Sequence, residues 1–370
     1  MNKKIIYVLQ GGGALGSFQL GGVKALYEKQ YFPNMLVGIS IGAINAAIIA
    51  GNEDSKVIEK LEDFWNMITT KHSIDSFFNG NFLKFKNYLS AQQAIFLGQE
   101  NFYKKNNIIH LPFANYKVEE LSYYDISPLK DTLNKLIDFN YLNEKHKRLC
   151  VGVTNLSSGE FVFFDSFKEE IKLEHILASG ALPPAFPAVK IEDQYYVDGG
   201  VYANTPLTKV LEEFETNEEN VKNNLVFMFD LFSAKGILPH SMDGMLERIK
   251  DIQFSSHSKR PTNIYSTVQN MSRVIKLLGS YLPSDIKNRE DVKQLLKLGN
   301  VNNIDLVHII YHSKKGTELE SKDYNFSREA KIIHKQEGYK KTMEIIKEDE
   351  ESWLKKDNNG IEIHTLDSEN

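Results

Sequence analysis

Cysteine is nearly absent from this sequence, because Cys150 is the single one among 370 residues. An intramolecular disulfide is therefore excluded, and a reducing compartment fits this composition. Cys150 lies within an apolar run, so we expect a buried thiol of the core rather than a reactive one. Histidine, cysteine and carboxylate residues do not gather at metal-ligand spacing either, and the sequence predicts no metal site and no cofactor.

Long hydrophobic runs and a large excess of one charge are also missing. The longest apolar stretch, 39–50, includes Ser40 and Asn45 and falls short of the ~20 residues that a membrane-spanning helix needs. The net charge of −5 gives no reason to expect nucleic-acid binding. Because no leader-like segment is visible near Met1, we expect a cytoplasmic protein, either soluble or in peripheral contact with a membrane.

Strand and helix patterns alternate along most of the chain, which predicts an α/β fold with a mainly parallel sheet. Strands are predicted at 5–9, 35–39, 148–154, 160–164, 188–191, 195–197, 225–231 and 304–311. Helices are predicted at 18–29, 41–50, 55–69, 127–137, 173–179, 207–214, 242–254, 263–278, 291–298 and 327–347.

The pattern becomes mostly helical after about residue 236. We therefore divide the chain into a domain at 1–235 and an extension at 236–370 that packs on this core. The strand at 304–311 is the part of the extension that could join the sheet. From about 348 onward the sequence is polar, and we expect a frayed tail there.

One serine stands at a strand-to-helix junction, in the motif Gly38-Ile39-Ser40-Ile41-Gly42. Glycines two residues on either side of a serine permit the sharp turn of a nucleophile elbow, which places the hydroxyl at a helix N-terminus. The pattern alone is common. Its weight comes from a glycine run at 11–16 and from Asp198-Gly199-Gly200.

These three segments contain the groups that acyl transfer needs, namely a nucleophile, a base and donors for an oxyanion. Ser40 supplies the hydroxyl, and Asp198 is the candidate base if its site is partly desolvated. The backbone N–H groups of Gly11, Gly12 and Gly13 are the oxyanion-hole candidates, because no side chains separate them from a ligand.

Taken together, the motifs resemble those of the patatin-like phospholipases, in particular a bacterial subset with a C-terminal extension. The resemblance runs from 5 to about 210 through four blocks, at 11–16, 38–42, 178–187 and 198–200. It implies a three-layer α/β/α fold and phospholipase A-like hydrolysis of fatty-acyl esters, with a phospholipid or other acyl lipid as substrate. It also implies a Ser40–Asp198 dyad without a catalytic histidine and an oxyanion site on Gly11, Gly12 and Gly13.

The chain departs from the family at one loop position, where Leu15 stands in place of the usual Arg or Lys. This departure, together with the large extension, keeps open a non-catalytic lipid-binding or regulatory protein with a vestigial site. The oligomeric state is left undetermined.

Two other enzyme classes are compatible with parts of the pattern. The run at 11–16 also satisfies G-x-G-x-x-G, the fingerprint of a dinucleotide-binding oxidoreductase, but no acidic residue follows the second strand as that fold requires. A Ser-His-Asp hydrolase could use His240, His257, His308 or His312, although none has distinctive flanks. We place the dyad ahead of both alternatives.

A phenylalanine-rich, lysine-bearing segment at 71–115 has no clear periodicity. It could form a lid or an acyl-chain groove that meets lipid surfaces, since aromatic side chains and nearby cations suit an interface. An insertion that packs on the core is an equal alternative.

Overall fold

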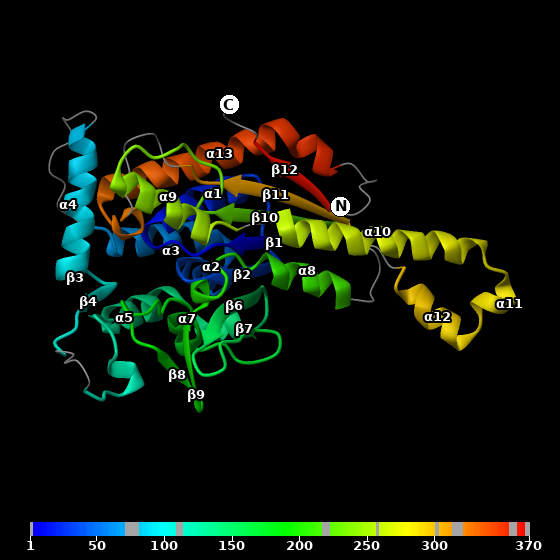
Figure 1. Cartoon of the computed structure of the whole chain (residues 1–370), viewed down its shortest axis with the longest axis horizontal. Helices are drawn as coiled ribbons and strands as arrows, with labels where there is room; N and C mark the ends of the chain where they lie inside the picture. The colour runs from blue at the N-terminus through cyan, green and yellow to red at the C-terminus, as the bar shows by residue number, and fades with distance from the viewer. Residues whose placement is uncertain are drawn as a thin grey trace.

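The computed structural model describes most of the chain as an α/β protein. The described residues are 3–70, 81–108, 114–216, 223–256, 259–299, 303–312, 321–354 and 361–366. Figure 1 shows a central sheet between helices, with the long helix α10 (Lys259–Tyr281) projecting beyond the sheet.

The described residues form a nine-stranded sheet of order β12-β11-β10-β1-β2-β6-β9-β8, in which β7 also pairs with β6. The first six strands of this order run parallel, whereas β7, β8 and β9 pair antiparallel. Their bounds are β1 (Lys4–Leu9), β2 (Met35–Ile39), β6 (Arg148–Asn155), β7 (Phe161–Asp165), β8 (Val189–Ile191), β9 (Gln194–Asp198), β10 (Asn223–Asp230), β11 (Asn303–Ile310) and β12 (Ile361–Thr365). The predicted mainly parallel sheet is confirmed.

Both faces of the sheet are covered by helices, which explains the continuous apolar runs of the strands. In β1, Tyr7 and Leu9 pack with α1 (Ser17–Glu28), α2 (Ile41–Ala50), α3 (Asp54–Met67) and α13 (Arg328–Leu354). Ile6 and Val8 point to the other face, where Val210 of α8 (Leu207–Thr216) and Tyr265 of α10 cover them. The result is the predicted three-layer α/β/α arrangement.

The remaining helices, turns and strands surround this frame. The helices are α4 (Asn81–Leu97), α5 (Ser127–Leu136), α6 (Phe139–Asn143), α7 (Leu173–Ser179), α9 (Met242–Phe254), α11 (Ser284–Lys287) and α12 (Glu290–Lys297). The 3₁₀ turns are η1 (Gly13–Gly16), η2 (Val118–Glu120), η3 (Gly199–Val201) and η4 (Lys322–Tyr324), and a small sheet contains β3 (Gly98–Gln99), β4 (Tyr103–Lys105) and β5 (Tyr124–Asp125). Within the described ranges, no helix is both long enough and apolar enough to cross a bilayer.

Helices α1 and α13 cross at very short range because glycine occupies both contact points. A Cβ on Gly21 would lie 1.9 Å from the Lys335 carbonyl oxygen, and a Cβ on Gly338 would lie 1.9 Å from that of Phe18. This crossing holds the extension directly against the helix that follows the glycine run.

The end of the chain differs from the prediction. The strand at 304–311 joins the sheet as β11, but the tail expected to fray from 348 continues as α13 to Leu354, and β12 then pairs with β11. Trp353 explains the difference, because its side chain is fully buried and its indole N–H donates to the Tyr31 hydroxyl at 3.3 Å. The segment is polar overall, and this composition led to the prediction of a frayed tail. The prediction did not weigh Trp353, which anchors the helix, or the alternating Ile361 and Ile363 of β12.

The segment at 71–115 also gains structure that its sequence did not reveal. It contains the 17-residue helix α4 and the strands β3 and β4. Phe102 is buried, whereas Phe96 is 64% exposed. The other parts of this prediction, at 71–80 and 109–113, lie outside the described residues.

Candidate active site

Ser40 occupies a strained turn between β2 and α2, as the motif predicted. Its φ of 55° and ψ of −128° lie in a region that side-chain-bearing residues rarely adopt. Gly38 and Gly42 must both be glycine, because other backbone atoms lie too close to leave room for a side chain. A Cβ on Gly38 would lie 2.5 Å from the Gly42 carbonyl oxygen, and one on Gly42 would lie 2.2 Å from that of Leu9. The turn therefore sets the hydroxyl at the N-terminus of α2, where the helix dipole favours negative charge.

Ser179 holds this turn in place, a contact that sequence reasoning missed. The backbone N–H of Ser40 donates to the Ser179 hydroxyl oxygen at 3.0 Å, and that hydroxyl donates to the Gly152 carbonyl at 2.7 Å. Because Ser179 is fully buried, the pair is shielded from water. The only sequence signal was its position inside the block at 178–187.

Asp198 ends β9 and lies directly beside Ser40. Its carboxylate accepts a hydrogen bond from the Gly200 N–H at 2.7 Å and is hydrogen-bonded to the Ser40 side chain. Its backbone is fixed as well, because its N–H donates to the Ala181 carbonyl at 3.0 Å and its carbonyl accepts from the Thr154 hydroxyl at 3.2 Å. The chain thus brings together two side chains that are distant in sequence.

Burial dominates the electrostatics of Asp198. The side chain is 2% exposed, and this desolvation raises its pKa from 3.8 to about 7. The hydrogen bonds from Ser40 and Gly200 favour the carboxylate and offset part of the effect. A carboxyl with a pKa near 7 is suited to exchange a proton at neutral pH.

The glycine run approaches the same point, but its three members differ. The Gly11 N–H donates to the Asn204 carbonyl at 3.3 Å, while the Asn204 side-chain amide donates back to the Gly11 carbonyl at 3.1 Å. Gly12 and Gly13 line the cleft with Ser40, and no described residue accepts a hydrogen bond from either N–H. The Gly11 N–H, predicted as an oxyanion donor, is therefore already hydrogen-bonded to Asn204. Among the described contacts, the N–H groups of Gly12 and Gly13 have no acceptor.

Gly13 has a second constraint, which comes from the extension. Its φ of +53° favours glycine, and an added Cβ would lie 2.3 Å from the Asp323 carbonyl oxygen in η4. Leu15, the departure from the family pattern, is fully buried in the core. Its backbone N–H donates to the Gly12 carbonyl at 3.1 Å, so this residue stabilises the conformation of the glycine loop.

A buried chain of amide side chains ties the glycine loop to the helices behind it. The Gln10 carbonyl accepts from the Gln19 side chain at 2.7 Å, and the Gln19 oxygen accepts from Asn45 at 2.8 Å. The Asn45 oxygen in turn accepts from the Trp65 indole at 3.1 Å. A satisfied polar network of this kind fixes the loop position.

The cleft around these groups is mainly apolar. Aromatic and aliphatic side chains line it, namely Ile41, Ile44, Phe102, Tyr103, Ile126, Leu129, Leu182, Phe186, Phe232, Phe254, Tyr324 and Phe326. Its cavity volume of about 80 Å³ is below the roughly 300–1,000 Å³ of common ligand sites. Side chains at its mouth must therefore move before a long acyl chain can enter.

Within the part of the chain that the structure describes, neither competing enzyme class fits this geometry. Asp323 and Leu231 crowd the glycine run where a dinucleotide pyrophosphate would lie. Among the described residues that line the cleft there is no histidine, and His308 instead pairs with Asp230 at 2.6 Å. His257 lies outside the described residues.

One group of side chains has the composition of a metal site. Asp305, Glu362 and His364 place one ligand atom each within 4.8 Å of one another on β11 and β12. The Lys3 ammonium lies 2.8 Å from Asp305, however, and His364 lies 3.2 Å from it. These partners already compensate the buried carboxylate, so the arrangement is explained by ion pairing.

Comparison with known proteins finds two family profiles and several relatives that match this sequence. The profile described as "Patatin-like phospholipase" matches residues 7–211, and one described as "Patatin phospholipase" matches 252–359. The uncharacterized protein L620 of Acanthamoeba polyphaga mimivirus is 24% identical over 55% of this chain, and the probable lipid hydrolase 463L of Invertebrate iridescent virus 6 is 22% identical over 61%. The chain spans 63% of the length of the first relative and 70% of the second.

Two solved structures are also similar. VipD from Legionella pneumophila aligns over 94% of this chain and 67% of its own, with 16% identity and a TM-score of 0.40. The type III effector protein ExoU aligns over 94% of this chain and 53% of its own, with 13% identity and a TM-score of 0.36. Because the first profile covers more than half of the sequence, the chain belongs to the patatin-like phospholipase family.

Proposed function

We propose that the chain is a serine-dependent lipid acyl hydrolase, phospholipase A-like, in which Ser40 is the nucleophile and Asp198 the base. The observation that carries this proposal is that Ser40 and the buried Asp198 line the same apolar cleft, where the Ser40 side chain helps to lower the pKa of the Asp198 carboxyl. Family membership supports a lipid acyl ester as the substrate. The donors assigned to the oxyanion are the N–H groups of Gly12 and Gly13.

The proposed reaction has two halves. In the first, the Ser40 oxygen bonds to the acyl carbonyl carbon as its proton passes to Asp198, and the carbonyl electrons move onto the oxygen near Gly12 and Gly13. The ester C–O bond then breaks, and the leaving alkoxide takes the proton from Asp198. In the second half, Asp198 removes a proton from water, and the water oxygen bonds to the acyl carbonyl carbon. The bond from that carbon to the Ser40 oxygen then breaks, Asp198 returns the proton to the Ser40 oxygen, and the fatty acid is released.

The environment of Asp198 supports this role. A carboxylate with an ordinary pKa would be a weak base at neutral pH, whereas burial raises the pKa here to about 7. The hydrogen bond from the Gly200 N–H keeps the carboxylate oriented at 2.7 Å without neutralising it. No histidine is required to relay the proton.

A covalent fluorophosphonate probe tests the proposal. Wild type should be labelled, and Ser40→Ala should not be, while Ser157→Ala, a change in an exposed turn, should be labelled normally. Hydrolysis of a panel of phospholipids is measured by mass spectrometry of the released fatty acid. Wild type and Ser157→Ala should release fatty acid, and Ser40→Ala should not. A variant Asp198→Asn should lose about 10³-fold or more in turnover, within the range for removal of a catalytic base.

A non-catalytic lipid-binding protein is the second candidate, favoured by Leu15 in place of a basic residue and by the narrow cleft. A folded wild type that binds lipid but is not labelled, and that releases no fatty acid from any lipid of the panel, would establish it. The cytoplasmic location with peripheral membrane contact stays a prediction from the sequence.

A further inference from the structure

Helix α9 presents its apolar side to solvent. Five residues at helical spacing are between 44 and 78% exposed, namely Met242, Met245, Leu246, Ile249 and Ile252. None of the α9 residues is classed as buried. A surface helix of a globular protein ordinarily turns such a stripe toward the core.

The inward side of α9 is charged instead. Lys250 pairs with Asp323 at 2.6 Å, and Asp251 pairs with Lys322 at the same distance. Glu247 also contacts Lys322, at 3.3 Å. Because the ion pairs hold α9 to η4, the apolar stripe is free to meet something other than this chain.

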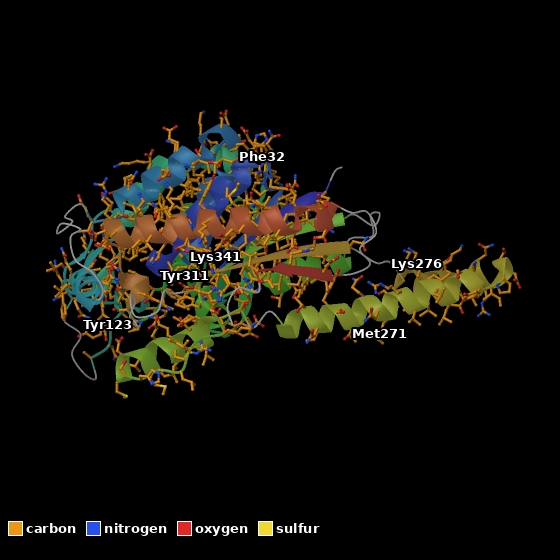
Figure 2. The ribbon with its side chains drawn as sticks, turned by 90° about the horizontal axis from the view of Figure 1, so that it is seen from above. Phe32, Tyr123, Met271, Lys276, Tyr311 and Lys341 are labelled. Carbon is orange, nitrogen blue, oxygen red and sulfur yellow. The ribbon has the colours of Figure 1, made fainter. Side chains whose placement is uncertain are left out.

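Helix α10 continues the same surface. Ile264, Val268, Met271 and Leu278 share one side of α10 by helical spacing and are 38 to 63% exposed, while Tyr265 is buried. Val274, Leu277 and Tyr281 are exposed elsewhere on the same helix. Figure 2 shows Met271 on the outer side of α10, at the border of the molecule along which α9 also lies. We call the nine outward residues of α9 and α10 the apolar platform.

The charge of this region points to the kind of partner. Residues 259–299 contain eight Lys and Arg and three Asp and Glu, a net charge of +5, so the remainder of the chain has −10. Within α10 there are four basic residues and no acidic one. A basic amphipathic helix with exposed bulky apolar residues is typical of elements that lie in a membrane interface. Two copies of the same cationic region would repel each other across a two-fold axis, which disfavours a second copy as the occupant.

The platform borders the cleft. Phe254, the last residue of α9, lines the cleft with its side chain, and its carbonyl accepts hydrogen bonds from Asn204 at 3.0 Å and Gln10 at 2.8 Å. The partners of α9 in η4 include Asp323, which abuts Gly13. An object bound to α9 would therefore lie at the edge of the candidate active site.

We propose that the apolar platform docks the protein onto an anionic lipid bilayer, so that lipid enters the cleft from the bound surface. This inference rests on the proposed function for its substrate, but the docking surface itself is tested separately. The apolar residues enter the interfacial region, and the net positive charge of 259–299 favours an anionic surface over a neutral one.

Flotation of the full chain with vesicles tests the docking. Wild type and Ser40→Ala should float with phosphatidylcholine–phosphatidylglycerol vesicles, less with pure phosphatidylcholine, and less at high salt. The double variant Leu246→Glu/Ile249→Glu and the single variant Met271→Glu should each lose about tenfold or more in partitioning. The matched control is Phe32→Glu, an exposed apolar residue on the opposite border of Figure 2, which should bind as wild type does. Circular dichroism verifies that each variant is folded.

The outcomes separate docking from catalysis. The ratio of vesicle hydrolysis to hydrolysis of a water-soluble short ester should fall in the α9 and α10 variants but not in Phe32→Glu. If Ser40→Ala floats while wild type hydrolyses nothing, the docking inference stands and the proposed function fails. Equal flotation of wild type and the folded platform variants would refute the docking inference. So would a wild type that ignores vesicles and forms a dimer that Leu246→Glu/Ile249→Glu disperses.

Discussion

The titration of Asp198 yields a prediction that links activity to stability. Burial raises its pKa from 3.8 to about 7, and the proposed base acts only as the carboxylate. The kcat/KM for a water-soluble ester should therefore fall on the acid side with a midpoint near pH 7. At pH 6 about one tenth of the enzyme would be ionised, and at pH 8 about nine tenths, so the rate should differ about tenfold.

The same group should destabilise the fold at neutral and alkaline pH. The folded state retains the Asp198 proton up to about pH 7, whereas the unfolded chain loses it near 3.8. The contribution of Asp198 to the free energy of unfolding is therefore most favourable below about pH 4, decreases as the pH rises to 7, and then stays constant. The pKa difference corresponds to about 4 kcal/mol at pH 8.

The substitution Asp198→Asn removes the titrating proton but retains an oxygen that can accept from the Gly200 N–H. The variant should be inactive and yet more stable than wild type, by up to about 4 kcal/mol at pH 8 and by about 2 kcal/mol at pH 5. Urea unfolding at the two pH values measures this difference. Asp193→Asn, an exposed position of the same hairpin, is the matched control and should change neither stability nor rate.

Two results would refute the reasoning. A pH–rate profile that stays flat between pH 5 and 8 would show that no group with a pKa near 7 controls the reaction. A stability difference between Asp198→Asn and wild type that does not change with pH would show that ionisation of the buried Asp198 carboxyl does not destabilise the fold. If only the second result occurs, the kinetic midpoint belongs to another group.

Three further substitutions probe the supports of the site. Gly13→Ala should reduce kcat by about 10²-fold or more with little change in KM, because its Cβ would collide with the Asp323 carbonyl and displace the oxyanion donors; an unchanged kcat would exclude Gly13 from that role. Ser179→Ala should lower the free energy of unfolding by about 1–3 kcal/mol in urea titrations, since the Ser40 N–H loses its buried acceptor; equal stability would show that water replaces it. Gly21→Ala should lower the melting temperature by several degrees, because an added Cβ meets the α13 backbone at 1.9 Å; an unchanged melting temperature would show that the two helices can separate without cost.

Local patterns were sufficient to predict the strands of the central sheet other than β12, and the turn at Ser40. The glycines at 38 and 42 specify that turn because each is in contact with backbone only a short distance away, and the apolar run of β1 is continuous because helices cover both faces. The motifs were sufficient to name Ser40 and Asp198 as candidate nucleophile and base, and the family resemblance gave this pair its preference over the alternatives. Composition and spacing contain no information on which distant segments adjoin.

The contacts that the sequence did not predict join residues that are distant in the chain, and the residues next to them form no recognisable motif. The Asn204 carbonyl accepts from the Gly11 N–H, so the oxyanion donors that we propose are those of Gly12 and Gly13, and nothing near residue 204 indicates this contact. The apolar stripe of α9 has the spacing of a core-facing helix. Only its ion pairs with η4 reveal that the stripe points outward.

The extension after residue 235 contributes to the candidate site as well as to the sheet. Its η4 turn presses a carbonyl against Gly13, and the last residue of α9 forms part of the cleft wall. Strand β11 covers the edge of β10, which would otherwise expose unpaired backbone groups, and β12 covers the edge of β11. The proposed division at 235 and 236 follows the change in sequence pattern. The glycine loop, however, is contacted by Asn204 before this boundary and by Asp323 after it. The Lys250–Asp323 ion pair thus lies between α9, where we propose docking, and the turn whose carbonyl adjoins Gly13 of the proposed oxyanion site.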